Sequence, residues 1–296
     1  MSGSLFRMPV LLLCAFALLS VGRVRADVEV LSLYQMTARA PLVARVRGLS
    51  GATRRPHVEV VRIFKGHYAA GTLQVVPTWI DRTDPIPGVE REVFREGEES
   101  ILFLRPYVDE FGRPGDDRTF SVLSAARGKV DLPSEGSDAV VEAIVRFVQI
   151  LELKDHNEQG VALRSLLRES SPMLLEAGIE ECVRFRFVIP EDADAILSLL
   201  AHPRPGFRAG AIGLVRILVL DFPSADNQRL FDSVAGAARL DSDPSVRIGA
   251  VRALESFGTE AAFVVIERIG RFDSNQDVRY EAQVAAYHLR DRLREK

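Results

Sequence analysis

A phrase that occurs twice near the carboxyl end constrains the fold more than any other feature of this sequence. The segment Asp243–Leu254 reads DPSVRIGAVRAL, and the segment Asn275–Ala286 reads NQDVRYEAQVAA. Arg279 therefore stands 32 residues after Arg247. A fixed period of about 20 to 50 residues is typical of stacked repeat units, so this half of the chain is predicted to be an array of helical hairpins.

Weaker copies of the same phrase precede these two. The segment PGFRAGA at 205–211 places Arg208 at 39 residues before Arg247, and SPMLLEA at 171–177 has Leu174 where the other copies have arginine. Second helices of each pair are expected near residues 190–201, 224–240 and 259–272, and a first pair at 138–152 and 158–167. The region from 138 to 296 is thus predicted to be all-helical.

The pattern D-x-x-V-R-x-x-A-x-x-A-L in these copies resembles the HEAT family in its short bacterial form. The resemblance implies an α-solenoid over 138–296 whose groove binds a protein or peptide. The candidate site residues on the repeat face are Arg208, Arg247, Arg279, Asp243 and Asp277. Two readings of them stay open. The arginines pair with aspartates of the adjacent repeat while the two aspartates cap helix starts, or the arginines bind an acidic partner.

The first half of the chain alternates between short apolar runs and turn residues. A short helix is expected after Ser32 and ends at Pro41. Strands are expected over 42–47, 57–64, 72–77, 98–104 and 119–123, with a short sixth at 126–130. These elements predict a small antiparallel β-barrel over 27–132, and the polar segment 133–137 is the predicted linker. The predicted fold class is α+β in two domains.

Several segments of this half resemble a recurring secreted bacterial domain, which is similar to the OB-like barrel of netrin and metalloproteinase-inhibitor modules. They are LVARV at 42–46, VVRIFKG at 60–66 and GEESILFL at 97–104. The segment lacks the amino-terminal cysteine of the inhibitor modules, so inhibition by their mechanism is not expected. OB-like barrels bind sugars or oligonucleotides on one face. The residues that could do so here are Arg45, Arg47, Arg54, Arg55, Arg62 and Trp79, with solvated strand faces and loops as the alternative.

The amino terminus has the form of a secretory signal peptide. Arg7 precedes an apolar run over 8–21, and Val24 and Ala26 place small residues before a cleavage site after 26. The protein is therefore expected to be secreted or periplasmic, without stable membrane insertion after cleavage of residues 1–26. Loss of three arginines takes the formal net charge from -3 to -6, which argues against nucleic acid as a partner.

Residues with the spacing of a catalytic or metal site are not apparent in the sequence. None of the five histidines has the spacing of a metal-binding pair, and G-x-S-x-G, G-x-x-x-x-G-K and G-x-G-x-x-G do not occur. Asp116 and Asp117 could chelate calcium, but adjacent aspartates in such a loop are typical turn formers. Cys182 is expected to be a buried apolar residue rather than a reactive thiol. We therefore predict no catalytic residue, no cofactor and no metal.

Three functional hypotheses follow. The first is a non-enzymatic interaction scaffold whose solenoid groove binds an unidentified protein or peptide. The second is carbohydrate or cell-wall binding through the barrel, with the helices as a spacer. The third is an enzyme, because some proteins with this repeat type are lyases that attach bilins to phycobiliproteins. The predicted signal peptide speaks against a cytoplasmic pigment as substrate, so the first hypothesis is favoured and an enzyme is not expected.

Overall fold

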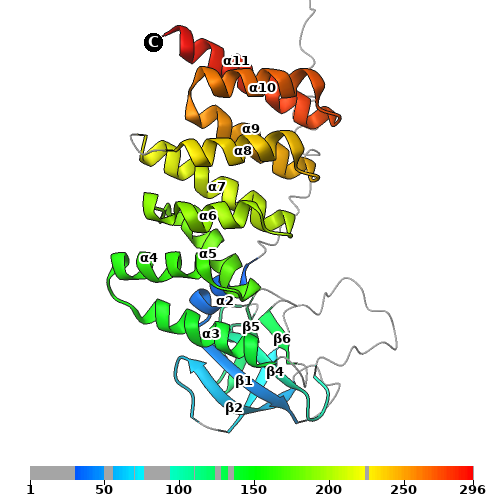
Figure 1. Ribbon diagram of the computed structural model, residues 1–296. Helices are drawn as coiled ribbons and strands as arrows, with labels where there is room; N and C mark the ends of the chain where they lie inside the picture. The colour runs from blue at the N-terminus through cyan, green and yellow to red at the C-terminus, as the bar shows by residue number, and fades with distance from the viewer. Residues whose placement is uncertain are drawn as a thin grey trace, which may run out of the picture.

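The computed structural model describes residues 31–49, 56–69, 71–76, 94–109, 111–123, 128–132, 137–223 and 227–295. A β-barrel and a stack of helices lie at opposite ends of this part of the chain (Figure 1). The fold is therefore α+β, as predicted. The segment interpreted as a signal peptide (1–26) and most of the linker (133–136) lie outside the described residues, as do Arg54, Arg55 and Trp79.

Strands close into a ring at the amino-terminal end of the described chain. The ring runs β1 (Leu42–Gly48), β2 (His57–Lys65), β3 (Thr72–Val76), β5 (Thr119–Val122) and β4 (Glu99–Pro106), which pairs back with β1. A further strand, β6 (Lys129–Asp131), pairs with β4 outside the ring. The predicted small barrel is confirmed, but the expectation of a wholly antiparallel barrel is wrong, because β3 and β5 run parallel. A closed ring of five strands cannot alternate in direction all the way round, so one neighbouring pair must be parallel, and here it is β3 and β5.

Two strand segments, 42–44 of β1 and 101–104 of β4, are buried on both faces. Ala44 and Leu102 point into the barrel, whereas their neighbours Val43 and Phe103 point outward into a second apolar cluster beneath α3. Successive side chains of a strand face opposite sides, so a strand with both sides covered needs apolar residues throughout. This accounts for the uninterrupted apolar run at 101–104.

Two helices join the barrel to the stack: α2 (Leu33–Arg39), which begins at a capping box on Ser32, and α3 (Ser137–Glu152). Ile144 of α3 packs in the outer cluster of the barrel, and Phe147 packs in the core of the helices. Tyr34 of α2 joins the same helical core, with its ring edge-on to Phe147 at 5.3 Å between centroids. Both helices flanking the barrel thus contribute to the helical core, across the boundary predicted at 133–137.

Beyond α3 the described chain is helical throughout. The elements are α4 (His156–Ser165), η2 (Leu166–Arg168), α5 (Pro172–Phe185), η3 (Pro190–Asp192), α6 (Ala193–Leu200), α7 (Pro205–Asp221), α8 (Gln228–Leu240), α9 (Pro244–Phe257), α10 (Glu260–Phe272) and α11 (Gln276–Arg294). Helices α5, α7, α9 and α11 contact one another in that order and form an inner row. Helices α6, α8 and α10 form a second row against it (Figure 1).

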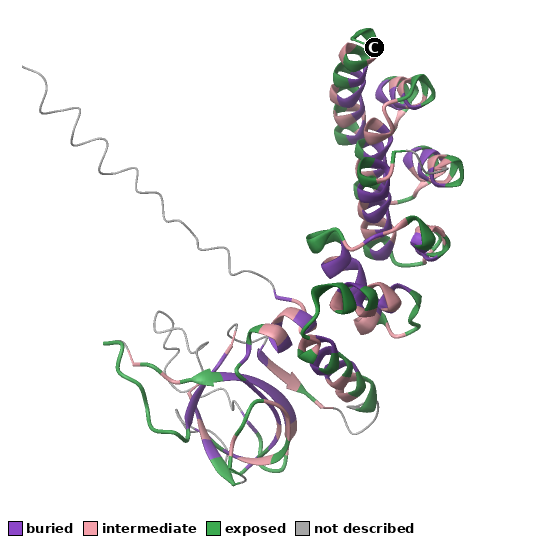
Figure 2. Ribbon diagram, turned by 90° about the vertical axis from the view of Figure 1, so that its left-hand side faces the viewer, coloured by how far each residue is buried: buried purple, intermediate pink, exposed green. Residues whose placement is uncertain are grey.

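Small residues set the spacing between these helices. A Cβ atom added at Gly178 of α5 would lie 2.8 Å from the Cβ atom of Leu166, so only glycine allows this approach. Ala250 of α9 and Ala282 of α11, which occupy equivalent positions of the two copies of the phrase, are fully buried. The buried residues gather where the helices meet (Figure 2), and one apolar core runs from Tyr34 to Leu289.

Candidate functional site

Arginine–aspartate pairs link successive helices of the inner row. The Nε and Nη2 atoms of Arg208 each lie 2.7 Å from an oxygen of Asp241, the residue two positions before the N-cap of α9. Arg247 binds Asp273, two positions before the N-cap of α11, in the same way at 2.9 and 3.0 Å. Planar guanidinium–carboxylate pairs of this kind fix both distance and orientation. We call these two pairs the closed rungs.

The same arginines also hold the loop that precedes their own helix. Nη1 of Arg247 donates to the backbone carbonyl of Asp241 at 2.7 Å, and Nη1 of Arg279 donates to that of Asp273 at 2.7 Å. Each rung is therefore joined to the next through a loop aspartate, which accepts with its side chain from one arginine and with its carbonyl from the next. The hydrogen bonds from Arg208 lower the pKa of Asp241 below its usual value.

The structure assigns different roles to the predicted repeat-face residues. Arg208 and Arg247 are engaged within the chain by the closed rungs. Asp243 is the N-cap of α9 and accepts from the backbone nitrogen of Ser245 at 2.8 Å. Asp277 lies exposed in the first turn of α11, whereas the N-cap of that helix is Asn275.

The aspartates that complete the rungs, Asp241 and Asp273, were not among the predicted candidates. They stand 32 residues apart, as the two copies of the phrase do, so the repeat offset could have revealed them. Arg279 follows the same series, but no described carboxylate forms an ion pair with its guanidinium. It is the open rung.

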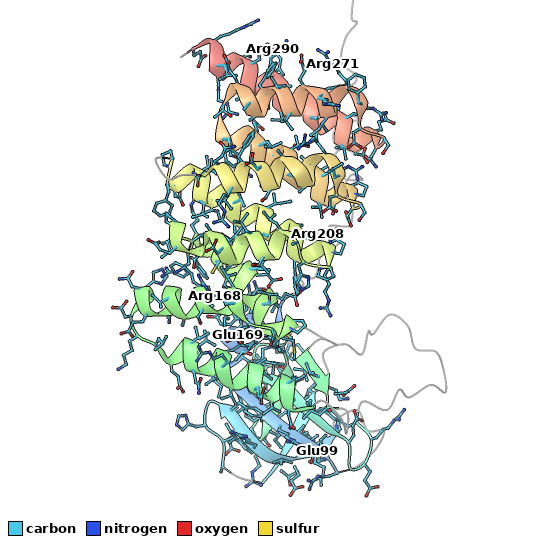
Figure 3. All side chains as sticks on the ribbon, in the orientation of Figure 1. Glu99, Arg168, Glu169, Arg208, Arg271 and Arg290 are labelled. Carbon is cyan, nitrogen blue, oxygen red and sulfur yellow. The ribbon has the colours of Figure 1, made fainter. Side chains whose placement is uncertain are left out.

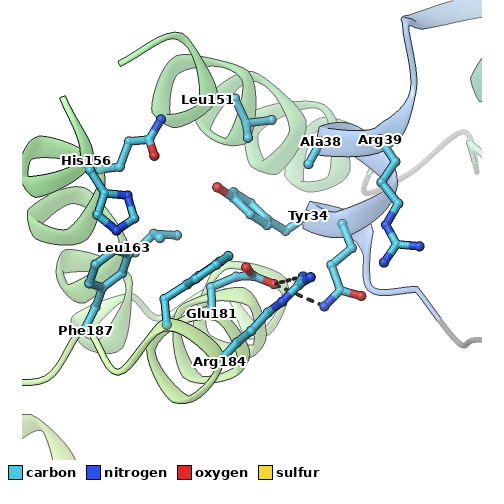
Figure 4. A pocket seen from close by; sticks show the side chains of 12 residues that line it. Tyr34, Ala38, Arg39, Leu151, His156, Leu163, Glu181, Arg184 and Phe187 are labelled. Atoms are coloured by element: carbon cyan, nitrogen blue, oxygen red, sulfur yellow. Dashed lines mark hydrogen bonds and ion pairs between the residues drawn. The ribbon is translucent and has the colours of Figure 1, made fainter. Parts of the chain in front are cut away.

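A pocket of about 300 Å³ lies where α2 and α3 meet the start of the stack (Figure 4). Its lining residues come from α2, α3, α4, α5 and the loop after α5: Tyr34, Gln35, Ala38, Arg39, Leu151, His156, Gln159, Leu163, Glu181, Arg184, Phe185 and Phe187. This volume is at the lower end of the range for small-ligand sites. We call it the junction pocket.

Aromatic rings form one wall of the junction pocket. The ring of Phe187 lies 4.7 Å from that of His156 and 5.7 Å from that of Phe185, measured between centroids. Between the two phenylalanines, Arg186 adopts a left-handed backbone conformation with φ 57°, unusual for a residue with a side chain. Its side chain is held by Asp221. Arg186 is the C-cap of α5, and a left-handed residue is a common way to end a helix.

A carboxylate lies at the base of the junction pocket. The side chain of Glu181 is only 1% exposed, and it accepts a hydrogen bond from Nε2 of Gln35 at 3.1 Å. The guanidinium of Arg184 lies 3.8 Å from this carboxylate, and half of its side chain is exposed. Burial, together with the charge of Glu181, raises the pKa of Tyr34 to about 12.

The barrel arginines that are described already have partners. Arg47 forms ion pairs with Glu59 at 3.3 Å and Glu99 at 2.8 Å, and Arg45 also pairs with Glu99. Arg62 lies over the ring of Phe64. These contacts agree with the reading in which the arginines occupy solvated strand faces.

The aspartate loop of the barrel behaves as a turn. Asp116 accepts from the hydroxyl of Thr119 at 2.5 Å and from the backbone nitrogen of Arg118 at 3.1 Å. The described ranges contain no cluster of three or more histidine, cysteine, aspartate or glutamate side chains that could hold a metal ion. Over the same ranges no helix combines the length and apolar character needed to cross a membrane.

Comparison with known proteins adds no further assignment. No protein-family model matches the chain, and no curated protein or solved structure shows significant similarity to it.

Proposed function

We propose that this protein is a non-enzymatic interaction scaffold that acts outside the cell or in the periplasm. The helical stack is a HEAT-type solenoid whose groove binds a protein or peptide, and the barrel is an OB-like domain at its base. The inner row of helices and its closed rungs support the solenoid assignment. The apolar run over 8–21 supports the secreted or periplasmic location.

The junction pocket is the observation that carries the proposal. It is large enough for one or two side chains, and its aromatic wall suits an apolar group. Phe185 is 47% exposed, although its ring belongs to that wall. The guanidinium of Arg184 stands near this ring, 5.2 Å from its centroid, where it can donate to the carbonyl oxygens of a bound peptide.

A peptide that inserts one apolar side chain into the junction pocket therefore fits the lining chemistry. Exposed aromatic rings contribute much of the binding energy at such anchors, because they bury a large area at a low cost in side-chain entropy.

Selection of displayed peptides on the immobilised whole chain tests the proposal. Selected peptides should share an apolar anchor residue, and Phe185→Ala should weaken their binding about tenfold or more, as measured by fluorescence polarisation. Val264→Ala is the matched control, since Val264 is 64% exposed on α10 and does not line the junction pocket. Equal loss in both variants, or no enriched peptide at all, contradicts the proposal.

A further inference from the structure

Helix α11 is the last helix of the inner row in the described chain. One side of α11 is exposed, although the equivalent side of α9 is the one that packs against α11. On α9 this face is identified by two contacts with α11: Arg252 pairs with Glu281 at 2.7 Å, and Glu255 pairs with Arg292 at 3.0 Å. Val251, on the same side of α9, is fully buried. Helix α11, the next helix of the inner row, therefore covers this side of α9.

The equivalent side of α11 follows from the repeat offset of 32 residues. Ile248 and Glu255 of α9 correspond to Tyr280 and Tyr287 of α11. Ile248 packs against the helical core, whereas Tyr280 is 67% and Tyr287 64% exposed. Two exposed tyrosines, two helical turns apart on one side of α11, are unexpected on a face that contacts only solvent. Terminal repeats of solenoids usually have polar outer faces.

The open rung lies at the start of this same helix. Arg279 binds the carbonyls of Asp273 and Ser274 at 2.7 and 3.1 Å, as Arg208 binds those of His202 and Pro203. In the two closed rungs the opposite edge of the guanidinium holds an aspartate two residues before the next N-cap. For Arg279, no carboxylate of the described chain occupies that place.

Both arginines and acidic residues border the exposed face. Arg271 and Arg290, labelled at this end of the stack in Figure 3, share one carboxylate, that of Glu267, at 2.8 and 3.6 Å. Arg290 and Tyr287 also line a hollow of about 190 Å³ between α10 and α11. Asp277, three residues before Tyr280, and Asp291, four residues after Tyr287, lie on the same side of α11, so the face as a whole has no excess of positive charge.

The uncovered edge of the Arg279 guanidinium, rather than the net charge of the face, favours a partner that supplies a carboxylate at that point. A two-fold contact would bring the same surface together from both copies, and its aspartates, Asp277 and Asp291, lie within α11 and not two residues before a helix N-cap as in the closed rungs. A head-to-tail contact would need a free first helix, but α2 and α3 cover that end of the stack. Opposite charge across an interface, by contrast, accelerates association and excludes wrong partners.

We infer that the exposed face of α11, formed by Arg279, Tyr280, Gln283 and Tyr287, docks a partner helix whose preceding turn carries an aspartate. That aspartate closes the open rung as Asp241 and Asp273 close the others, and the helix covers the two tyrosines. The inference rests on the proposed scaffold function and names a second contact surface for it, distinct from the junction pocket.

The test titrates a helix-stabilised peptide into the whole chain and follows its fluorescence polarisation. The peptide begins Asp-Ser-Asp-Pro, the turn at residues 241–244, and continues as three helical turns with one apolar face. A matched peptide has asparagine in place of the first aspartate. The first peptide should bind about tenfold or more tightly than the second, since the loss of a hydrogen-bonded charge has an effect of this size.

Variants locate the binding surface. Arg279→Gln should remove the preference for aspartate, and Tyr287→Ala, which changes an exposed side chain, should weaken both peptides. Arg216→Gln is the control, because Arg216 is exposed on α7, away from this face. Equal affinity of the two peptides, or binding unaffected by Arg279→Gln and Tyr287→Ala, overturns the inference.

The outcome for the proposed function is separate. If the helical peptides fail to bind while selected peptides bind in a manner sensitive to Phe185→Ala, the docking face is wrong and the scaffold function stands. If neither kind of peptide binds, both fall.

Discussion

Arg247 and Asp273 form a two-pronged ion pair with Nε–Oδ2 and Nη2–Oδ1 distances of 2.9 and 3.0 Å, and their side chains are only 9% and 7% exposed. The pair connects α9 to the loop before α11. A pair shielded from solvent in this way depends on both partners, because either charge alone would be left buried without compensation.

Arg247→Ala should therefore lower the free energy of unfolding by about 2–4 kcal/mol. Arg252→Ala is the matched control on the same helix. Arg252 pairs with Glu281, but 55% of its side chain is exposed, so the change should cost about 1 kcal/mol or less. Urea unfolding followed by circular dichroism measures both. Similar losses of unfolding free energy for the two variants would show that a closed rung stabilises the fold no more than an exposed ion pair does.

The rung between Arg208 and Asp241 should make stability depend on pH. Hydrogen bonds from Arg208 lower the pKa of Asp241 in the folded state, so the ionised carboxylate stabilises the fold above its unfolded pKa of about 4. This contribution is lost as the pH falls through the lower, folded value. The stability advantage of the native chain over Asp241→Asn should thus be full at neutral pH and shrink below about pH 4. A difference that stays constant down to pH 3 in urea titrations contradicts this assignment.

Cys182 should be unreactive in the folded protein. Burial is the main cause that raises the pKa of its thiol to about 12, so almost no thiolate exists at pH 8. Iodoacetamide should leave Cys182 unmodified in native conditions and alkylate it in urea, as judged by mass spectrometry of the tryptic peptide. Rapid native alkylation would mean that α5 opens readily.

The close approach at Gly178 should tolerate no side chain. A Cβ atom there would lie 2.8 Å from the Cβ atom and 3.1 Å from the carbonyl carbon of Leu166, so Gly178→Ala should destabilise by about 1–3 kcal/mol. Gly236→Ala is the control. No atom lies within 4 Å of a Cβ at Gly236, and alanine favours a helix there by about 0.5–1 kcal/mol. The midpoint of thermal unfolding should fall for Gly178→Ala and rise for Gly236→Ala.

The helical segment should depend on the barrel for its solubility. Ile144 and Val148 of α3 are buried against Val43 and Phe103 of the barrel, and a fragment of residues 138–296 would expose them. The fragment should bind more of the apolar dye ANS than the whole chain, and Ile144→Ser with Val148→Ser should reduce this binding. A monomeric fragment without added dye binding would instead support independent domains divided at 133–137.

Local patterns in the sequence predicted the elements well. The capping serine at 32 and Pro41 bracket α2, the apolar runs became the strands of the barrel, and the repeated phrase fell on α9 and α11. These features depend on side-chain periodicity and on caps within a few residues of each other, which a sequence displays directly.

The sequence by itself determined the elements and the repeat offset, whereas the tertiary structure decided which charges meet. Asp241 completes a rung because the loop before α9 passes α7, and Asp273 does so because the loop before α11 passes α9. These aspartates stand 33 and 26 residues from their arginines in sequence. The junction pocket draws on α2 and α5, whose Gln35 and Glu181 are 146 residues apart. Contacts at such separations are set by how whole helices pack, which residue spacing along one helix cannot specify.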